Sequence, residues 1–560
     1  MPNVDHLGRP TRPRRASAAV WLFLLLVPFV ATACISVQSD LLATPTPSIA
    51  PATARADASP TQAPLASPTP TPTPEPTPEP VEAEVLGFVP NWLLEDAEDA
   101  IDTDLVTIAA FHSIEASQQG KLVSKKPNRD VPAGWAALGS DEFKELQKQL
   151  QAAGVKVVPV IQRAGWTEGT RERIITLLTK KKNRRALAER IAGFVSGRGF
   201  DGVNLDFEPL PAKVADQYVE FVREVRAALD DIDPELHLSV DIVPGLENYQ
   251  LAALTADDAA DLAVIMGYGY RTTSSKVAGS TAPLVDPDTL DLTSAVEAAL
   301  EQTEPGKLLL ALPWYGLAWS TQSDKARSEV RTGKGIDGSA NAGYATAVEQ
   351  AIKSGRRYQP DQASAWTVYA AKQCSGCPAT WRQVWYDDPD SFTAKADFAL
   401  EQELAGIGIW ALGMDDGREE MGWALRNVLR PRLDESPPNG SPAIDPEAIR
   451  GELEGRSVVV GSAPLRLFAA DDVDGTGLAL ARIGLTGELD DEGMLVTGRT
   501  YPAADRIDFP LGDESTGGSA EEGPRSIHVQ WRDLAGNWSV PIVIEVHVLD
   551  PVASTTPSDL

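Results

Sequence analysis

Eight short apolar segments, separated by stretches with helical spacing, occupy residues 84–430 of this chain. Several of them are almost continuously apolar, as strands buried on both faces are. Eight such strands alternating with helices predict an α/β fold of the (β/α)8, or TIM, barrel type. The expected strands are Val85–Val89, Leu105–Phe111, Val155–Ile161, Gly202–Phe207, Leu236–Ile242, Leu262–Met266, Lys307–Leu312 and Gly406–Trp410.

A doubly wound sheet is the alternative fold for this alternation. Such a sheet usually carries a glycine-rich phosphate-binding turn after an early strand, whereas Val89 is followed by Pro90, Asn91 and Trp92. The stretch from Leu317 to about Asp390 is too long for a normal loop, so we expect a small insertion after strand seven. The helix after strand four is predicted by apolar residues with a 3.6 period, namely Val214, Tyr218, Phe221, Val225 and Leu229.

The first residues have the pattern of an export signal. Several arginines precede the apolar run Ala18 to Val30, which is short for a membrane span and typical of a secretory signal. The following Ala31-Thr32-Ala33-Cys34 resembles a bacterial lipobox, although Ala31 stands where Leu is usual. The resemblance implies a signal peptide at residues 1–33, lipidation of Cys34 and anchoring on the outer face of the cytoplasmic membrane. An ordinary signal peptide with an incidental cysteine is the alternative.

Proline marks the remaining boundaries. Many of the 43 prolines fall in Thr-Pro, Ala-Pro and Glu-Pro repeats after Thr44, which cannot pack or pair and form an extended spacer. We therefore expect a disordered stalk at residues 34–83, which would hold a domain at residues 84–430 away from the membrane. A second proline-rich linker is expected at residues 431–446, before a smaller module at residues 447–551.

The residues with catalytic potential lie in the fourth predicted strand, Asp201-Gly-Val-Asn-Leu-Asp-Phe-Glu208. Side chains alternate across a strand, so Asn204, Asp206 and Glu208 share one face and the apolar residues between them share the other. The apolar face packs against the helices, and the polar face must point into the barrel. Two carboxyl groups this close raise the pKa of one of them, which then serves as a general acid. Glu208 falls at the carboxyl end of its strand, where barrel active sites lie.

This segment resembles the signature Asp-Gly-x-Asp/Asn-x-Asp/Asn-x-Glu of family 18 glycoside hydrolases, the chitinase family. Other stretches are similar to the strands of that family: Val264-Ile-Met266-Gly-Tyr268, Leu312-Pro-Trp314-Tyr-Gly and Gly406-Ile-Gly-Ile-Trp410. The resemblance covers about residues 84–430 and is greatest to a bacterial branch that includes spore-cortex and cell-wall glucosaminidases. It implies a retaining hydrolase of β-1,4-linked N-acetylglucosamine polymers, either chitin or peptidoglycan, that needs no metal or other cofactor.

The resemblance also implies a role for each matching residue. Glu208 would protonate the glycosidic oxygen, and the 2-acetamido group of the substrate would replace a second carboxylate as the nucleophile. Asp206 would orient that group, with support from Asp201 and Asn204 through hydrogen bonds. The other implied site residues are Tyr268, as a partner of the acetamido oxygen, Trp410, as the floor under the sugar, and Met266, Trp92, Trp314 and Trp319, as further substrate contacts.

One departure from the family pattern is Gly269, which stands where Asp is usual and puts activity or substrate choice in question. The alternative function is a non-catalytic, lectin-like glycan-binding protein on the same barrel. Such proteins typically lose the glutamate, and Glu208 is present, which favours catalysis. The formal net charge of −30 disfavours nucleic acid as a partner. We expect a monomer whose partners are a polysaccharide and, through the lipid, a membrane.

Two of the three cysteines fall within the insertion expected after strand seven. Cys374 and Cys377 form a C-x-x-C, which outside the cell favours a local disulfide over a free or metal-binding pair. Residues 447–551 contain short β-rich runs and predict a β-sandwich. The segment Val529 to Ser539 resembles immunoglobulin-like modules of bacterial surface proteins. Its Trp531 and Trp538 could form a glycan-binding platform, but the cores of β-sandwiches also contain buried tryptophan, so we favour a structural role for both.

Overall fold

The computed structural model describes residues 82–94, 101–246, 248–336, 338–431, 433–472 and 475–552. The predicted signal peptide, Cys34 and almost all of the predicted stalk lie outside these ranges. Within them, no helix combines the length and the apolar character needed to cross a bilayer.

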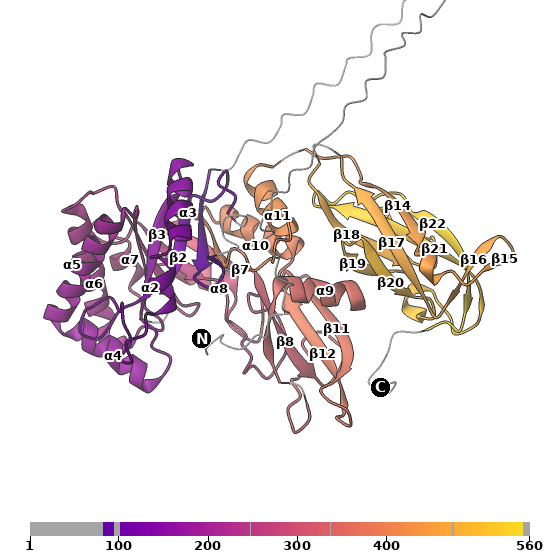
Figure 1. The fold of residues 1–560 in the computed structure, drawn as a ribbon, viewed down its shortest axis with the longest axis horizontal. Coiled ribbons are helices and arrows are strands. Elements are labelled where there is room, and N and C mark those ends of the chain that lie inside the picture. The colour runs from indigo at the N-terminus through magenta and orange to yellow at the C-terminus, as the bar shows by residue number, and fades with distance from the viewer. Residues whose placement is uncertain are drawn as a thin grey trace, which may run out of the picture. The chain divides into compact units, whose positions relative to one another are not determined.

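Eight parallel strands close into a barrel in the order β1-β13-β7-β6-β5-β4-β3-β2 (Figure 1). The (β/α)8 prediction is therefore confirmed, and the doubly wound alternative is excluded. The strands are β1 Glu84–Pro90, β2 Ile108–Glu115, β3 Lys156–Gln162, β4 Gly202–Asp206, β5 His237–Ile242, β6 Leu262–Met266, β7 Leu308–Pro313 and β13 Gly406–Trp410.

Helices cover the outside of the barrel. They are α2 Ala133–Ala137, α3 Asp141–Ala152, α4 Glu168–Thr179, α5 Lys181–Arg198, α6 Ala215–Asp230, α7 Leu251–Leu254, α8 Leu292–Leu300, α10 Pro389–Glu401 and α11 Glu420–Leu429. The helix predicted after strand four is α6, whose apolar face is buried as its 3.6 period requires. Sequence-encoded caps begin several helices; the Ser140 side chain, for example, accepts from the Phe143 amide at the start of α3.

The strand alternation divides the barrel into two apolar layers. Val203, Leu205 and Phe207 belong to the layer between strands and helices, and the ring of Phe207 lies 5.6 Å and 5.4 Å from those of Tyr218 and Phe221 on α6. A second cluster fills the barrel interior with residues from β1, β2, β3, β6, β7 and β13. Asn204, Asp206 and Glu208 are also buried, but on the opposite face of their strand, as predicted.

An insertion between β7 and α10 forms a five-stranded antiparallel sheet in the order β10-β11-β12-β8-β9. Its elements are β8 Tyr315–Thr321, β9 Ala340–Gly343, α9 Tyr344–Ser354, β10 Arg357–Gln359, β11 Ser364–Lys372 and β12 Ala379–Tyr386. Trp366 and Trp385 stack 5.1 Å apart in its core. The subdomain expected after strand seven is thus confirmed.

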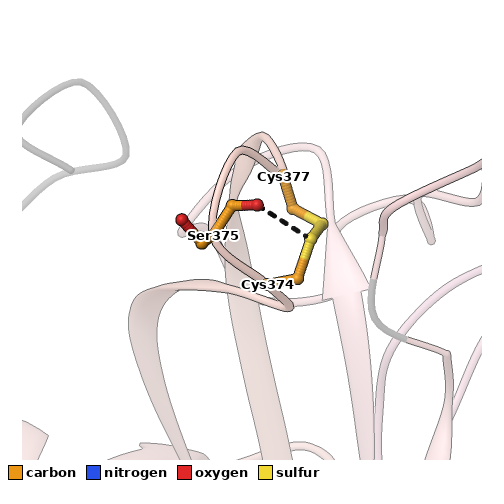
Figure 2. Close-up of a disulfide and its surroundings, with 3 residues drawn as sticks. All are labelled: Cys374, Ser375 and Cys377. Atoms are coloured by element: carbon orange, nitrogen blue, oxygen red, sulfur yellow. Dashed lines mark hydrogen bonds between the residues drawn. A yellow bond between two sulfur atoms is a disulfide. The ribbon is translucent and has the colours of Figure 1, made fainter.

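Cys374 and Cys377 are joined by a disulfide in the loop between β11 and β12 (Figure 2). The Ser375 carbonyl lies 3.4 Å from the Cys374 Sγ. The structure therefore agrees with the predicted local disulfide and not with a free pair.

Two sheets with one shared core form the C-terminal module, which is the architecture of a β-sandwich. The three-stranded sheet has the order β14-β17-β20 and the six-stranded sheet has the order β15-β16-β22-β21-β18-β19. The strands are β14 Asn439–Ile444, β15 Glu452–Leu453, β16 Arg456–Val460, β17 Ser462–Ala470, β18 Leu478–Gly484, β19 Arg499–Pro502, β20 Arg506–Pro510, β21 Gly523–Asp533 and β22 Ile542–Leu549.

The module begins earlier than predicted. Strand β14 falls inside the expected linker at residues 431–446 and pairs along its whole length with β17. Asp445, next to it, is buried and forms an ion pair with Arg466 at 3.0 Å. The upper linker boundary is therefore wrong, because a proline such as Pro442 is tolerated in an edge strand. Trp531 is buried in the shared core, which supports its structural role.

Candidate active site

Glu208 lies two residues beyond the end of β4, at the carboxyl end of the barrel strands, and is only 5% exposed. Backbone hydrogen bonds tie this end of β4 to the segment after β3. The Arg163 amide donates to the Asp206 carbonyl at 2.7 Å, and the Gly165 amide donates to the Glu208 carbonyl at 2.6 Å. This approach requires glycine, because a Cβ at position 165 would lie 2.8 Å from the Pro209 carbonyl oxygen. The backbone that carries Glu208 is thus held in one place.

The environment of Glu208 favours its protonated form. Burial, and after it the charge of Asp206, raises the pKa of Glu208 to about 8. A hydrogen bond with the side chain of Trp166, itself 48% exposed, acts in the opposite direction. A carboxyl group with this pKa keeps its proton at neutral pH and can donate it to a bound substrate.

Asp206 is the second buried carboxyl group and is also 5% exposed. Its Oδ2 lies 3.6 Å from Nε2 of His112, a β2 residue. Its Oδ1 is buried without a hydrogen-bond partner. A buried, unpaired carboxylate oxygen is costly, so this atom is available to a ligand or to a proton on a neighbouring group.

Asn204 bonds to the next strand and not to Asp206. Its Nδ2 donates to Asp241 Oδ1 at 2.8 Å and to Ser239 Oγ at 3.0 Å, both on β5. Asp241 is 3% exposed and is the register partner of Asp206 across the β4–β5 ladder. Three acidic residues, Asp206, Glu208 and Asp241, therefore meet at this end of the barrel.

Asp201 takes no part in this cluster, so its predicted support of Asp206 is wrong. Its Oδ2 accepts hydrogen bonds from the Val157 amide at 2.7 Å and from Gln151 Nε2 at 2.8 Å. Asp201 precedes the first residue of β4 and Asp206 is the last, and five residues of extended chain span roughly 16 Å at about 3.3 Å each. Asp201 instead connects β4 to β3 and α3 at the opposite end of the strand.

Aromatic side chains surround the acidic cluster. Trp410, the last residue of β13, lies 5.1 Å from His112, 5.5 Å from Phe88 and 6.3 Å from Tyr268, as measured between ring centroids. Met266 joins the same interior cluster. Burial raises the pKa of the Tyr268 hydroxyl, so this hydroxyl remains a hydrogen-bond donor. Trp410, Tyr268 and Met266 are thus brought together with the acids, as predicted.

Of the other three tryptophans predicted as substrate contacts, one lies beside the site and two lie in apolar cores. Trp92 is 41% exposed and lies 6.2 Å from His112 between ring centroids, so it borders the site. Trp314 is 2% exposed and packs edge-on against Phe392 of α10. Trp319 is fully buried in the core of the insertion. The prediction is therefore wrong for Trp314 and Trp319, because both side chains lie in apolar cores that no glycan reaches.

The sequence-based prediction missed three residues of this site: His112, Asp241 and Trp166. His112 and Asp241 had a detectable signal. Within β2, His112 follows Ile108 and Ala110 on the inward side, and within β5 Asp241 follows Ser239 two residues earlier. A polar residue on the inward side of a buried strand near its carboxyl end indicates a site. Trp166 lies in the segment after β3 and carries no such periodic signal.

The described residues contain a group of acids close enough to share a metal ion, and it is not in the barrel site. It consists of Asp434, Asp471 and Asp533, whose carboxylate oxygens lie within 4.8 Å of one another. Several of these oxygens already accept hydrogen bonds, from Thr476, Gly477 and Asn537 among others.

Comparison with known proteins agrees with this geometry. The family model described as glycosyl hydrolases family 18 matches residues 84–415. The putative sporulation-specific glycosylase YdhD of Bacillus subtilis is 25% identical over 282 residues, which are 49% of this chain and 61% of that protein. This chain thus spans less than two thirds of that relative's length.

Two solved structures share the fold. A family 18 chitinase from Cycas revoluta, in complex with (GlcNAc)4, superimposes with a TM-score of 0.50 at 20% identity and covers 62% of this chain and 99% of its own. The spore cortex-lytic enzyme SleL of Bacillus megaterium superimposes with a TM-score of 0.50 at 18% identity and covers 63% of this chain and 76% of its own. Because the family model spans more than half of the 560 residues and its barrel is present with the acidic motif on β4, the chain belongs to the family 18 glycosyl hydrolases.

Proposed function

We propose that this protein hydrolyses β-1,4-linked N-acetylglucosamine polymers, chitin or the glycan strand of peptidoglycan, with retention of configuration at the anomeric carbon. The observation that carries the proposal is the pair of buried carboxyl groups at the carboxyl end of β4. One of them, Glu208, has a pKa of about 8, and the other, Asp206, lies beside it. This is the electrostatic arrangement of a general acid beside a charged carboxylate.

The proposed reaction has two steps. In the first, the acetamido carbonyl oxygen of the substrate forms a bond to the anomeric carbon while the glycosidic C–O bond breaks and Glu208 gives its proton to the departing oxygen. In the second, the Glu208 carboxylate takes a proton from a water molecule whose oxygen attacks the anomeric carbon and opens the oxazolinium ring. Family 18 is a known exception to the scheme with two catalytic carboxylates. Glu208 therefore acts alone as acid and then as base.

Asp206 and Tyr268 are proposed to hold the acetamido group. The unpartnered Asp206 Oδ1 is available to accept the acetamido N–H or a proton from a neighbour, and its charge stabilises the positive charge of the oxazolinium ion. The Tyr268 hydroxyl would donate to the acetamido oxygen. Trp410 would form the apolar floor on which the sugar ring stacks, since apolar sugar faces pack on aromatic rings.

The rate is expected to fall as the pH rises through about 8. Glu208 must be protonated in the first step, and its pKa of about 8 keeps the proton on over the whole neutral range, whereas a glutamate with the ordinary value of 4.5 would have lost it. The profile of kcat/KM against pH measures this pKa in the free enzyme. An alkaline limb that lies below pH 6 would contradict the assignment of Glu208 as the acid.

Trp410→Ala is expected to weaken binding and slow turnover together. A nucleobase stacked on an aromatic side chain contributes about 1–3 kcal/mol. If a sugar ring stacked on Trp410 contributes a similar free energy, its loss predicts a fall in kcat/KM of about 5- to 150-fold. Trp314→Ala is the contrasting variant, because Trp314 packs against α10. It should lower the melting temperature and leave kcat/KM of the folded protein close to the parent value. Equal falls in kcat/KM for both variants would argue against the assigned floor.

Turnover of defined chitooligosaccharides and of purified peptidoglycan separates the possible functions. Hydrolysis of either polymer supports the proposal, and the ratio of the two rates identifies the substrate. Binding of a glycan without hydrolysis would contradict the proposal and support the lectin-like alternative. The net charge of −30 predicts weak electrostatic attraction to anionic cell-wall polymers.

We also propose that the enzyme acts at the cell surface, tethered through a lipid on Cys34. The support comes from the lipobox-like Ala31-Thr-Ala-Cys34 and the proline-rich segment that follows it. Metabolic labelling with a fatty acid should mark the parent protein and not Cys34→Ala. An unlabelled parent protein would contradict the lipid anchor and support an ordinary signal peptide instead.

A further inference from the structure

Asp241 occupies a position that the roles proposed so far do not use. It lies on β5, one residue before the end of the strand, and is the register partner of Asp206 on β4. Register partners on adjacent parallel strands are close neighbours, with strands about 4.8 Å apart. Asp241 is 3% exposed, so its carboxyl group has little access to water.

The hydrogen bonds around Asp241 fix its orientation. Oδ1 accepts from Asn204 Nδ2 at 2.8 Å, and the same amide group also donates to Ser239 Oγ, two residues earlier on β5. Asn204 can donate to Asp241 and cannot take up or release a proton. Two buried carboxyl groups on adjacent strands repel each other when both are charged, which favours a proton on one of them.

Asp206 supplies the matching acceptor. Its Oδ2 faces His112 at 3.6 Å, and its Oδ1 is buried and unpartnered. We propose that Asp241 is a positioning residue that stays protonated and donates a hydrogen bond to the free Oδ1 of Asp206 in the resting enzyme. The proton holds Asp206 against β5 until the substrate's acetamido N–H competes for the same oxygen. This role deepens the proposed function and rests on it.

The electrostatic surroundings support the protonated state. Burial, and after it the charge of Asp206, raises the pKa of Asp241 well above its ordinary value, while the bond from Asn204 acts the other way. The titratable groups that face Asp241 are Asp206 and Glu208 at the end of β4, Tyr268 after β6 and Tyr218 on α6. No cation is among them, so the hydrogen bond from Asn204 is the one interaction among those named here that favours a charged Asp241.

Substitutions at position 241 test the hydrogen bond through its donor. In Asp241→Asn the amide oxygen can still accept from Asn204 and the amide nitrogen can donate to Asp206, so kcat/KM at neutral pH should stay close to the parent value. In Asp241→Ala the donor is lost, Asp206 is no longer held in place in the free enzyme, and kcat/KM should fall by about 10- to 100-fold. Ser239→Ala is the matched control, because it removes the other acceptor of Asn204 on the same strand and should leave kcat/KM unchanged.

Infrared spectroscopy tests the proton without requiring activity. In a Glu208→Gln background, which removes the neighbouring protonated carboxyl group, the difference spectrum between this protein and the same protein with Asp241→Asn should contain the C=O stretch of a protonated carboxyl at neutral pH. That band belongs to Asp241, because Asp241→Asn is the one difference between the two proteins. A difference spectrum without that band would overturn the proposal even if the enzyme hydrolyses its substrate. A band that behaves as expected in a protein without hydrolase activity would keep the protonated pair and reject the proposed function. Equal loss of kcat/KM in Asp241→Asn and Asp241→Ala would also overturn it.

Discussion

Glu208→Gln is expected to lower kcat on N-acetylglucosamine oligosaccharides by about 100- to 10,000-fold, the range in which general acid catalysis contributes to enzymatic rates. The amide has nearly the shape of the protonated carboxyl group and cannot release a proton. Because the site is buried and the backbone at this position is fixed by the bond from Gly165, the substitution should preserve the fold and oligosaccharide binding. The loss should therefore appear in kcat with KM nearly unchanged.

Glu224→Gln provides the matched control for this variant. Glu224 is also a glutamate with a partly buried side chain, but it lies on α6 and forms an ion pair with Arg184 at 2.9 Å. Its substitution should affect stability alone. Steady-state kinetics on both variants, with binding measured by calorimetry, separates the two roles. Equal turnover by the parent protein and Glu208→Gln would remove Glu208 from the chemistry.

Asp206→Asn is expected to have the second largest effect, a fall in kcat of about 100- to 1,000-fold, as when one electrostatic stabiliser of a transition state is removed. The charge that stabilises the oxazolinium ion is lost. The same charge is the second cause of the raised pKa of Glu208. Without it that pKa moves down toward the ordinary value, so the alkaline fall in activity should begin at a lower pH than in the parent protein.

Asp201→Asn distinguishes this effect from a general one of carboxyl loss in the motif. Asp201 lies at the other end of β4 and bonds to Val157 and Gln151. Its substitution should lower the melting temperature and leave the pH profile of the folded enzyme unchanged. The two pH profiles therefore provide the measurement. An unchanged alkaline limb in Asp206→Asn would show that Asp206 does not act on Glu208.

Strand positions were predictable where an apolar run and a strand coincide. Strands β6 and β13 have the predicted bounds. Strand β2 begins at Ile108 and not at Leu105, because the amides of Leu105 and Val106 both donate to the Asp102 carbonyl in a turn. Apolar residues buried in a turn have the same sequence signature as residues of a strand, so the boundary is not contained in the pattern.

The alternation of side chains along a strand predicts which face each residue occupies. Trp314 was assigned to the site from the family resemblance, although the alternation places it on the other face. Leu310 and Leu312 face the helix layer with Trp314, while Leu309 and Ala311 fill the barrel interior. The period of two thus places Trp314 outside the site. The same period places His112 and Asp241 inside it.

Other features depend on the closed barrel and not on any one segment. The bond from Asn204 to Asp241 requires the register of β4 against β5, and the approach of His112 to Asp206 brings β2 and β4 together across the barrel end. Register across a barrel is fixed by its shear and tilt, which no single strand encodes. Such contacts become visible only in the folded structure.

The anomer first released from tetra-N-acetylchitotetraose tests the central claim most directly. Proton NMR during the first turnovers distinguishes the two anomers of the new reducing end before they interconvert. Attack by the substrate's acetamido group followed by attack of water inverts the anomeric carbon twice, so the account predicts the β-anomer. Release of the α-anomer would show a single displacement by water and contradict the account, and binding without release of any product would contradict it equally.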